Sequence, residues 1–178
     1  MTGFAADGYH LRQGSPLDRA TLVKFMAYNY QELGAAPPPQ HLAATVDRYL
    51  SCETPVWFVE YPQPPSGPSP IAALWLGQAT DQRTGLLHPY LLLLYVDPDH
   101  RRRGLATALL QVAHQWAEAA GHRQMSLQVF SQNQAAQALY HKMGYQPEAI
   151  LMRRSLGDGA PQGQDQAPSP YHCPPLDS

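Results

Sequence analysis

The run LLLLYV at residues 91–96 constrains the fold more than any other feature of this sequence. Side chains alternate between the two faces of a strand, so a continuous apolar run needs cover on both faces. Asp97 and Pro98 end the run. The pattern predicts a central, covered strand and therefore a domain of mixed α/β class.

The turn RRRG at residues 101–104 leads from this strand into a predicted helix of about 104–120, which Gly121 ends. An apolar stripe on that helix is expected to face the sheet; it consists of Leu105, Leu109, Val112, Ala113 and Trp116.

The start of this helix is a candidate anion site. Backbone amides there have no partner within the helix, and the macrodipole adds about half a positive charge. Gly104 and Ala106 keep side chains small, so that a pyrophosphate could reach the amides. The three arginines supply counter-charge. A solvated basic turn is the alternative interpretation.

The remaining patterns predict a single mixed α/β domain without internal repeats. Ser15 is the expected N-cap of the first helix and Pro16 its first helical residue. The expected helices are 15–33, 39–50 and 133–143, and the expected strands are 9–13, 56–61, 71–78, 88–96, 125–129 and 149–153.

Prolines concentrate in two segments. YPQPPSGPSP at 61–70 lies between two β-rich runs and is expected to be a long, stiffened hairpin loop. Residues 157–178 are rich in Pro, Gly and Gln and nearly lack branched aliphatic side chains, which predicts a flexible tail. We therefore expect one domain at 1–156 and a C-terminal tail at 157–178.

Composition excludes several classes of protein. With 12 basic against 14 acidic residues the formal net charge is -2, which disfavours a nucleic-acid binder. No apolar run approaches the roughly 18 residues of a membrane span, and residues 1–10 do not resemble a signal peptide. A cytoplasmic protein without membrane association is expected. Cys52 and Cys173 lie far apart and the histidines are scattered, so we expect no metal.

Two sequence blocks resemble the GNAT superfamily of N-acyltransferases. The strand, VDP at 96–98 and the pattern Arg101-x-x-Gly104-x-Ala106 resemble its acyl-CoA motif Q/R-x-x-G-x-G/A. Asn133, Ala136 and LYHKMGY at 139–145 resemble its motif N-x-x-A-x-x-L-Y-x-x-x-G-F/Y, in the right order and at the right distance. The resemblance implies a GNAT-like fold, whose central, mostly antiparallel sheet is splayed at the acyl-CoA site and flanked by helices.

The resemblance also implies acetyl-CoA as co-substrate. The backbone of residues 94–96 would pair with the pantetheine arm like an added strand, and the amides of 102–107 would hold the pyrophosphate. Asn133 would bind the arm near the thioester, and Tyr140 would face the sulfur. The implied cofactor-binding residues are Leu94, Tyr95, Val96, Arg101, Arg102, Arg103, Gly104, Leu105, Ala106, Thr107 and Asn133.

Direct transfer of an acyl group to an amine needs a deprotonated amine, a polarised carbonyl and a proton for the leaving thiolate. Tyr140, with a reference pKa near 10, would be the acid, although a core tyrosine is the alternative. The amide of Val96 would polarise the carbonyl.

The expected base is missing from the sequence. Where the family places glutamates, this chain has Tyr90 and Gln128, which leaves His88, Tyr90 or a water chain to relay the proton. An amine that is already partly neutral, such as an α-amino group of pKa near 7.8, would need the least help.

The sequence therefore favours an acetyl-CoA-dependent N-acetyltransferase acting on a primary amine of a small molecule or of a peptide terminus. A non-catalytic acyl-CoA-binding module with the same fold is the alternative, and a nucleic-acid binder is disfavoured. The acceptor loops would come from the first two helices and from residues 77–90. The sequence does not decide between a monomer and a homodimer.

Overall fold

The computed structural model describes residues 8–51, 54–63 and 67–154. Its contacts divide the chain into two units, residues 1–146 and 147–178, and the helices and strands of the described residues lie in the first. The strands are β1 His10–Gln13, β2 Val56–Gln63, β3 Gly67–Thr80, β4 Leu87–Val96 and β5 Ser126–Leu127. The helices are α1 Arg19–Glu32, α2 Pro39–Tyr49, α3 Leu105–Ala119 and α4 Gln134–Lys142, with short 3-10 turns at Pro16–Asp18 and Pro98–His100.

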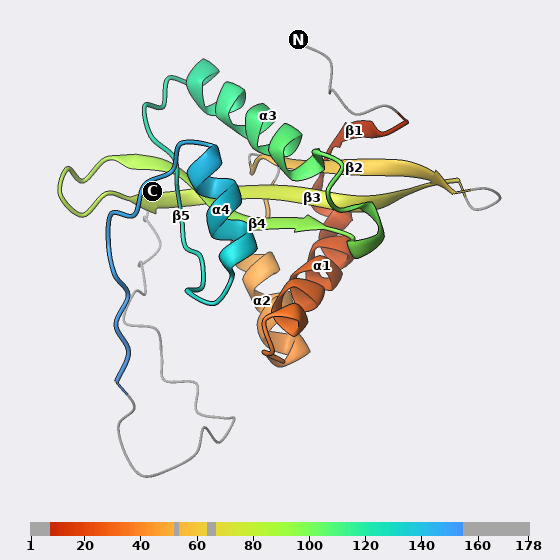
Figure 1. Cartoon of the computed structure of the whole chain (residues 1–178), viewed down its shortest axis with the longest axis horizontal. Helices are drawn as coiled ribbons and strands as arrows, with labels where there is room; N and C mark the ends of the chain where they lie inside the picture. The colour runs from red at the N-terminus through yellow and green to blue at the C-terminus, as the bar shows by residue number, and fades with distance from the viewer. Residues whose placement is uncertain (1–7, 52–53, 64–66, 155–178) are drawn as a thin grey trace, which may run out of the picture. The chain divides into compact units, whose positions relative to one another are not determined.

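The strands form one five-stranded sheet in the order β1-β2-β3-β4-β5 (Figure 1). The first four strands pair antiparallel, and only β5 runs parallel to its neighbour β4. The predicted mixed α/β class with a mostly antiparallel sheet is confirmed.

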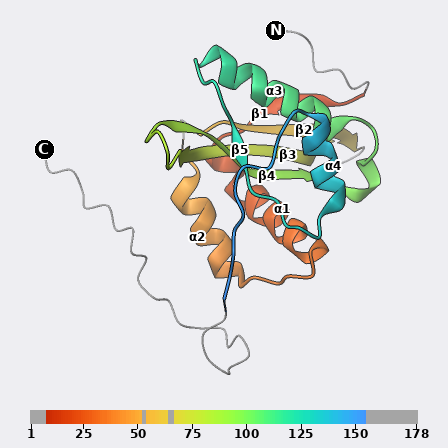
Figure 2. The ribbon, with the colours of Figure 1, turned by 60° about the vertical axis from the view of Figure 1, so that its left-hand side comes forward.

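The helices cover both faces of the sheet. Figure 2 shows α3 on one side and α1 with α2 on the other. The α1 and α2 side is filled by a core of Leu22, Phe25, Met26, Leu42, Val46, Val56, Phe58, Ala73, Trp75, Leu93 and Tyr95. The α3 side is filled by Trp57, Val59, Ile71, Ala72, Leu74, Leu76, Leu91, Leu105, Leu109, Leu110 and Ala113.

The most completely buried strand is β3. Residues 71–76 are all buried, whereas in β4 the buried residues 91, 93 and 95 alternate with half-buried ones. The predicted cover on both faces is confirmed, because Leu93 and Tyr95 lie in the α1 and α2 core while Leu91 lies in the α3 core, with Leu94 and Val96 partly buried against it. Over most of this run, β4 lacks a neighbouring strand on the side away from β3.

The missing neighbour begins at a bulge in β4. Trp75 pairs with Leu93 and Leu76 pairs with Leu91, so Leu92 is an extra residue in the ladder. On the other side, β5 pairs with β4 only at Tyr90 and Leu91. From residue 92 onward, no strand of the described ranges pairs with that edge, so β4 and β5 diverge as the resemblance implied.

The first helix is entered through a capped 3-10 turn. The side chain of Ser15 accepts a hydrogen bond from the amide of Leu17. The side chain of Asp18 accepts one from the amide of Ser15 at 2.9 Å, which completes a capping box. Arg12 of β1 binds Asp18 at 2.8 Å and Glu60 of β2 at 2.6 Å. The N-cap and proline positions are as predicted, and the regular helix starts at Arg19.

Three predicted details were wrong. The strands β2 and β3 extend into the proline-rich segment, where Pro62 pairs with Pro68 and Glu60 with Pro70. Beyond Glu60 this ribbon has only two strands, so each has a neighbour on one side only. A proline there can direct its missing N–H donor to the unpaired side. The strand expected at 125–129 is reduced to β5.

Residues 149–153 form no strand, because no ladder of the described residues includes them. Ile150, Leu151 and Met152 are exposed at 89%, 71% and 87%. An apolar run alone does not make a strand without a paired edge. The tail predicted at 157–178 lies outside the described residues. In the described ranges, we find no helix with the length and apolar character needed to cross a membrane.

Gly77 leaves the space that Leu92 of the bulge occupies. A Cβ at Gly77 would lie 2.7 Å from Cδ1 of Leu92, closer than real contacts allow. We therefore expect Gly77→Ala to lower the free energy of unfolding by about 1–3 kcal/mol, as overpacking does. Urea denaturation followed by circular dichroism measures this change.

The matched background is Leu92→Ala, which removes the atoms that the new methyl group would meet. In that background Gly77→Ala should cost much less than it does alone. Equal costs in both backgrounds would contradict this account of the bulge.

Candidate functional site

The turn between β4 and α3 holds a strained backbone. Asp97 accepts the amide of Asp99 at 3.0 Å and starts the short 3-10 turn. Arg102 follows with a φ of 62°, the only positive φ of a non-glycine residue in the described ranges, and Gly104 has a φ of 80°. A left-handed conformation at arginine costs on the order of 1 kcal/mol or more. It therefore marks a turn whose shape is imposed by its surroundings.

This turn ends in a row of unpaired amides. The first helical hydrogen bond of α3 runs from the amide of Ala108 to the carbonyl of Gly104 at 2.9 Å. In the part of the chain that the structure describes, the amides of residues 102–107 have no acceptor. A Cβ at Gly104 would meet no atom within 4 Å, so the space beside this residue is open. The geometry is that of an anion site at a helix N-terminus.

The three arginines beside this site differ in their partners. Arg101 donates to Glu32 of α1 at 2.5 Å and to the carbonyl of Val96 at 2.9 Å. Arg103 donates to the hydroxyl of Tyr9 at 3.0 Å and to a backbone carbonyl. Arg102 is exposed and has no bonded partner in the described ranges. Of the three, Arg102 is thus the cation that a bound anion could recruit at the lowest cost.

The open edge of β4 leads up to this turn. The amide of Asp97 donates to the carbonyl of Ile71 at 2.8 Å, so alternate residues of β4 bond to β3. Tyr95 accordingly bonds toward β3, whereas the amides and carbonyls of Leu94 and Val96 point to the edge that β5 leaves. The predicted trio thus presents two residues, not three, to a ligand at that edge.

The side chain of Tyr95 belongs to the core. Its ring stacks on Phe25 with centroids 4.6 Å apart and lies 6.0 Å from the ring of Tyr28. Burial raises the pKa of Tyr95 to about 12. Its contribution to the site is therefore the position of β4 rather than a polar contact.

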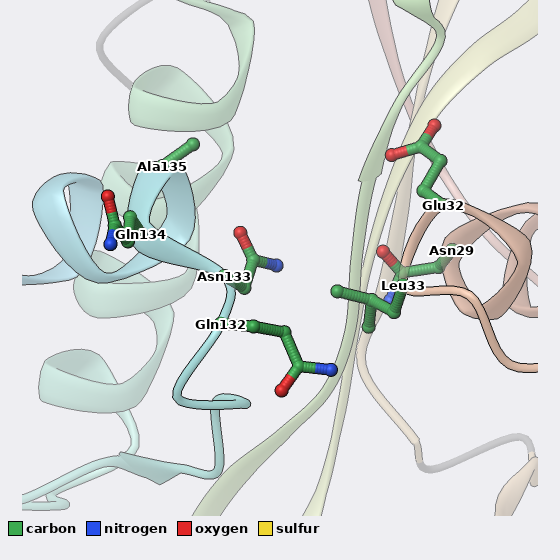
Figure 3. A pocket seen from close by; sticks show the side chains of 7 residues that line it. All are labelled: Asn29, Glu32, Leu33, Gln132, Asn133, Gln134 and Ala135. Atoms are coloured by element: carbon green, nitrogen blue, oxygen red, sulfur yellow. The ribbon is translucent and has the colours of Figure 1, made fainter.

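A pocket of about 350 Å³ lies between the end of α1 and the start of α4. Asn133 and Gln132 point into it from one side, opposite Leu33 and Asn29 (Figure 3). Its lining residues are Asn29, Glu32, Leu33, Gln132, Asn133, Gln134 and Ala135. Glu32 also borders a second hollow of about 340 Å³ beside Tyr95 and Asp97.

Asn133 has a structural role in addition to its place in this pocket. Its Oδ1 accepts the amide of Ala136 at 3.1 Å, so Asn133 is the N-cap of α4. The Nδ2 group is left as the donor that a ligand in the pocket could meet. The residue is thus a helix cap that also lines the pocket.

Tyr140 lies on α4 and packs with Leu139, Met143 and Trp116 against the α3 side of the sheet. Its hydroxyl has no hydrogen-bond partner in the described ranges. Burial raises the pKa of Tyr140 to about 12. The phenol is therefore protonated at neutral pH and able to donate.

His88 and Tyr90 share one face of β4, because they lie two residues apart on the strand. His88 is buried, its Nε2 lies 2.7 Å from Oγ of Ser126 on β5, and its Nδ1 is buried without a partner in the described ranges. Tyr90 is half-buried. Burial raises the pKa of Tyr90, and a hydrogen bond from the amide of Gln128 partly offsets that shift.

Sequence reasoning missed Glu32 and Ser126, which contact predicted site residues from distant parts of the chain. No local pattern marks either residue. In the described ranges, no three His, Cys, Asp or Glu side chains are placed to hold a metal ion.

The model of the acetyltransferase (GNAT) family matches residues 27–145. The chain is 36% identical over 81 residues to the uncharacterized N-acetyltransferase YdgE of Bacillus subtilis, covering 36% of this chain and 52% of that protein. The alignments span 32%, 22% and 52% of three curated relatives. The chain thus matches only part of the length of these relatives.

Solved structures share the fold at low sequence identity. A predicted acetyltransferase of Clostridium acetobutylicum, solved with acetyl-CoA, has a TM-score of 0.67 at 17% identity, covering 83% of this chain and 96% of that one. The aminoglycoside N-acetyltransferase AAC(6')-Iy, solved in complex with CoA, has a TM-score of 0.63 at 16% identity, covering 83% and 94%.

Tyr140 should titrate late in an alkaline titration. Because burial favours its neutral form, Tyr140→Phe should remove absorbance change at 295 nm from the part of the curve near pH 12. The contribution of the protonated Tyr140 side chain to the free energy of unfolding is fully present below the ordinary pKa near 10. It is lost as pH rises through the folded-state pKa of about 12. Loss of amplitude near pH 10 in the Tyr140 variant would contradict its burial.

Proposed function

The chain belongs to the acetyltransferase (GNAT) family, and on that premise we propose that it transfers an acetyl group from acetyl-CoA to a primary amine of a small molecule or of a peptide or protein terminus. The observation that carries this proposal is the continuity of two sets of backbone groups that have no backbone partner. The edge of β4 at Leu94 and Val96 leads through the strained turn to the free amides of residues 102–107.

These groups fit the two chemically distinct parts of acetyl-CoA. The amide groups of a pantetheine arm can bond to a strand edge as another strand would. A pyrophosphate suits the amides and the positive end of α3, with Arg102 as counter-charge. Asn133 supplies a donor in the pocket beside α1. We assign cofactor binding to these residues, with Arg101 and Arg103 shaping the turn.

When bound, acetyl-CoA supplies an acyl thioester that an amine can attack directly. Tyr140 would then give its proton to the leaving thiolate, since its pKa of about 12 keeps it protonated. The outward amide of Val96 would donate to the thioester oxygen and stabilise charge that develops there.

Of the two candidate bases, we prefer His88. Its buried Nδ1 has no partner in the described ranges, so the tautomer with the proton on Nε2, donating to Ser126, leaves a lone pair on Nδ1. The raised pKa of Tyr90 makes the phenolate scarce at neutral pH. We propose that His88 takes the proton of the amine and that Tyr90 orients the strand beside it.

One observation favours a second candidate, an acyl-CoA-binding module without turnover. No carboxylate stands at Tyr90 or Gln128, and the hydroxyl of Tyr90 is engaged by the amide of Gln128. A protein that kept the cofactor site and lost its base would have these features.

Turnover separates the two candidates. The full chain is incubated with acetyl-CoA and a panel of polyamines, amino acids, aminoglycosides and peptides, and mass spectrometry scores the gain of one acetyl group. A gain on any amine, with release of free CoA thiol, supports the enzyme. Saturable acetyl-CoA binding with no gain across the panel supports the binding module, and the absence of binding overturns both.

Gly104→Ala should weaken acetyl-CoA binding at least 10-fold in calorimetry while the fold is retained. The new methyl group would project into the open space in front of the amides, where the pyrophosphate would lie. Gly121→Ala is the matched control, because Gly121 ends the same helix at a φ of 83° with equally open space. Both variants carry the strain of a positive φ, so both should lose similar stability. Equal affinities in the two variants would contradict the pyrophosphate site.

Tyr140→Phe should lower kcat by about 10- to 10,000-fold on an acceptor identified by the panel, with little change in acetyl-CoA affinity. The ring and its packing remain, so the loss would belong to the hydroxyl. His88→Ala should in addition move the rising limb of the pH–rate profile, whereas Tyr90→Phe should not. Parent-like turnover in Tyr140→Phe would remove the acid assignment, and an unmoved limb in His88→Ala would remove the base assignment.

A further inference from the structure

The end of α4 turns the chain back onto Tyr140. Gly144 has a φ of 92° and its amide donates to the carbonyl of His141 at 3.0 Å. The amide of Tyr145 donates to the carbonyl of Tyr140, also at 3.0 Å. These two bonds form a Schellman motif, in which the residue after the glycine contacts the last helical turn. Tyr145 is that residue.

The ring of Tyr145 then contacts the ring of Tyr140 edge-on. The centroids are 5.7 Å apart and the planes meet at 67°, which is a favourable aromatic geometry. Backbone and side chain of Tyr145 thus both contact the proposed acid. The direction of the Tyr140 ring depends on where Tyr145 is held.

Tyr145 is held by α3. Its hydroxyl is hydrogen-bonded to Nε2 of His114 at 3.0 Å, and the two rings lie 5.6 Å apart. Burial lowers the pKa of His114, against the nearby carboxylate of Glu118. Burial, and then Tyr140, raises the pKa of Tyr145. Both partners are therefore neutral at physiological pH, and the bond does not depend on a charge.

α3 is also the helix whose first amides form the anion site. α4 is short, with nine residues, and none of its side chains is fully buried, so its own packing fixes it weakly. A tie from α3 through Tyr145 would set the position of Tyr140 relative to the phosphate end of the cofactor. A misplacement of about 1 Å at a reacting group can cost on the order of 100-fold in rate.

From this geometry we propose that Tyr145 and His114 are positioning residues, which hold the Tyr140 hydroxyl in place for acyl transfer. The inference rests on the proposed function, because it assigns a role in that reaction. It requires that the two residues act through Tyr140 rather than through cofactor binding or the acceptor.

The experiment measures kcat, KM and acetyl-CoA affinity on an acceptor that the parent protein acetylates. Tyr145→Phe keeps both ring contacts and removes only the hydroxyl bond to His114. His114→Leu removes the same bond from the other side, and His114→Gln restores a polar group at a similar reach. We expect roughly a 10-fold loss of kcat in Tyr145→Phe and His114→Leu, unchanged acetyl-CoA affinity, and recovery in His114→Gln. Tyr49→Phe, on α2, is the control for loss of a tyrosine hydroxyl and should match the parent.

A double-mutant cycle tests whether Tyr145 acts through Tyr140. In a Tyr140→Phe background, Tyr145→Phe should change kcat by less than about 2-fold, because the group that it positions is gone. Additive losses, or an unchanged kcat in Tyr145→Phe alone, would overturn the positioning role. Failure of the proposed function is distinct, since the parent would then acetylate no amine. Failure of the acid assignment is distinct as well, since Tyr140→Phe alone would then turn over normally.

Discussion

A strand that leaves its neighbour exposes a row of backbone donors and acceptors, and β4 does so from Leu92 onward. Unpaired groups of this kind are costly when buried, so a sheet normally pairs, covers or hydrates them. Here the bulge at Leu92 turns the strand at the point where β5 ends, and Gly77 makes the room that the bulge needs. The open edge is therefore built into the packing of the core, and the candidate site follows from it.

The second set of unpaired groups, at the start of α3, is held against that edge by an ion pair. Arg101 joins the carbonyl of Val96 to the carboxylate of Glu32, so the last residue of β4, the turn and the end of α1 share one anchor. The same carboxylate borders the pocket that Asn133 enters from α4. An exposed pair of this kind contributes little stability, on the order of 0–1 kcal/mol. Its consequence is geometric, because it places α1 beside the open edge.

The sequence predicted what depends on neighbours along the chain. The start of α3 at Gly104 and the cap at Ser15 are local features, and each is found where the residue types placed it. The proline ribbon was mispredicted, because the effect of a proline depends on whether its missing donor faces a partner strand.

The residue types of the candidate site were predictable from the sequence. The partners that each of these side chains binds were not. Arg101 and Arg103 are bound to Glu32 and Tyr9, which lie 69 and 94 positions away in the chain, so no local pattern could separate them from Arg102. The contact of His88 with Ser126 likewise depends on the parallel pairing of β4 with β5. Which side chains are free to meet a ligand is decided by tertiary pairing, and sequence spacing does not contain that information.

The charges around the pocket bear on the kind of amine that the proposed enzyme would accept. Glu32 is paired with Arg101, and neither Tyr90 nor Gln128 supplies a carboxylate, so the proposed base is the imidazole of His88. Removing a proton at pH 7 from a lysine amine of pKa about 10.4 costs about 3.5 kcal/mol more than removing it from an α-amino group of pKa about 7.8. An ionised carboxylate beside the ammonium would help to hold a cationic acceptor, and neither position supplies one. The proposed mechanism therefore favours acceptors whose amines are already partly neutral, such as peptide α-amino groups or amines depressed by neighbouring charge.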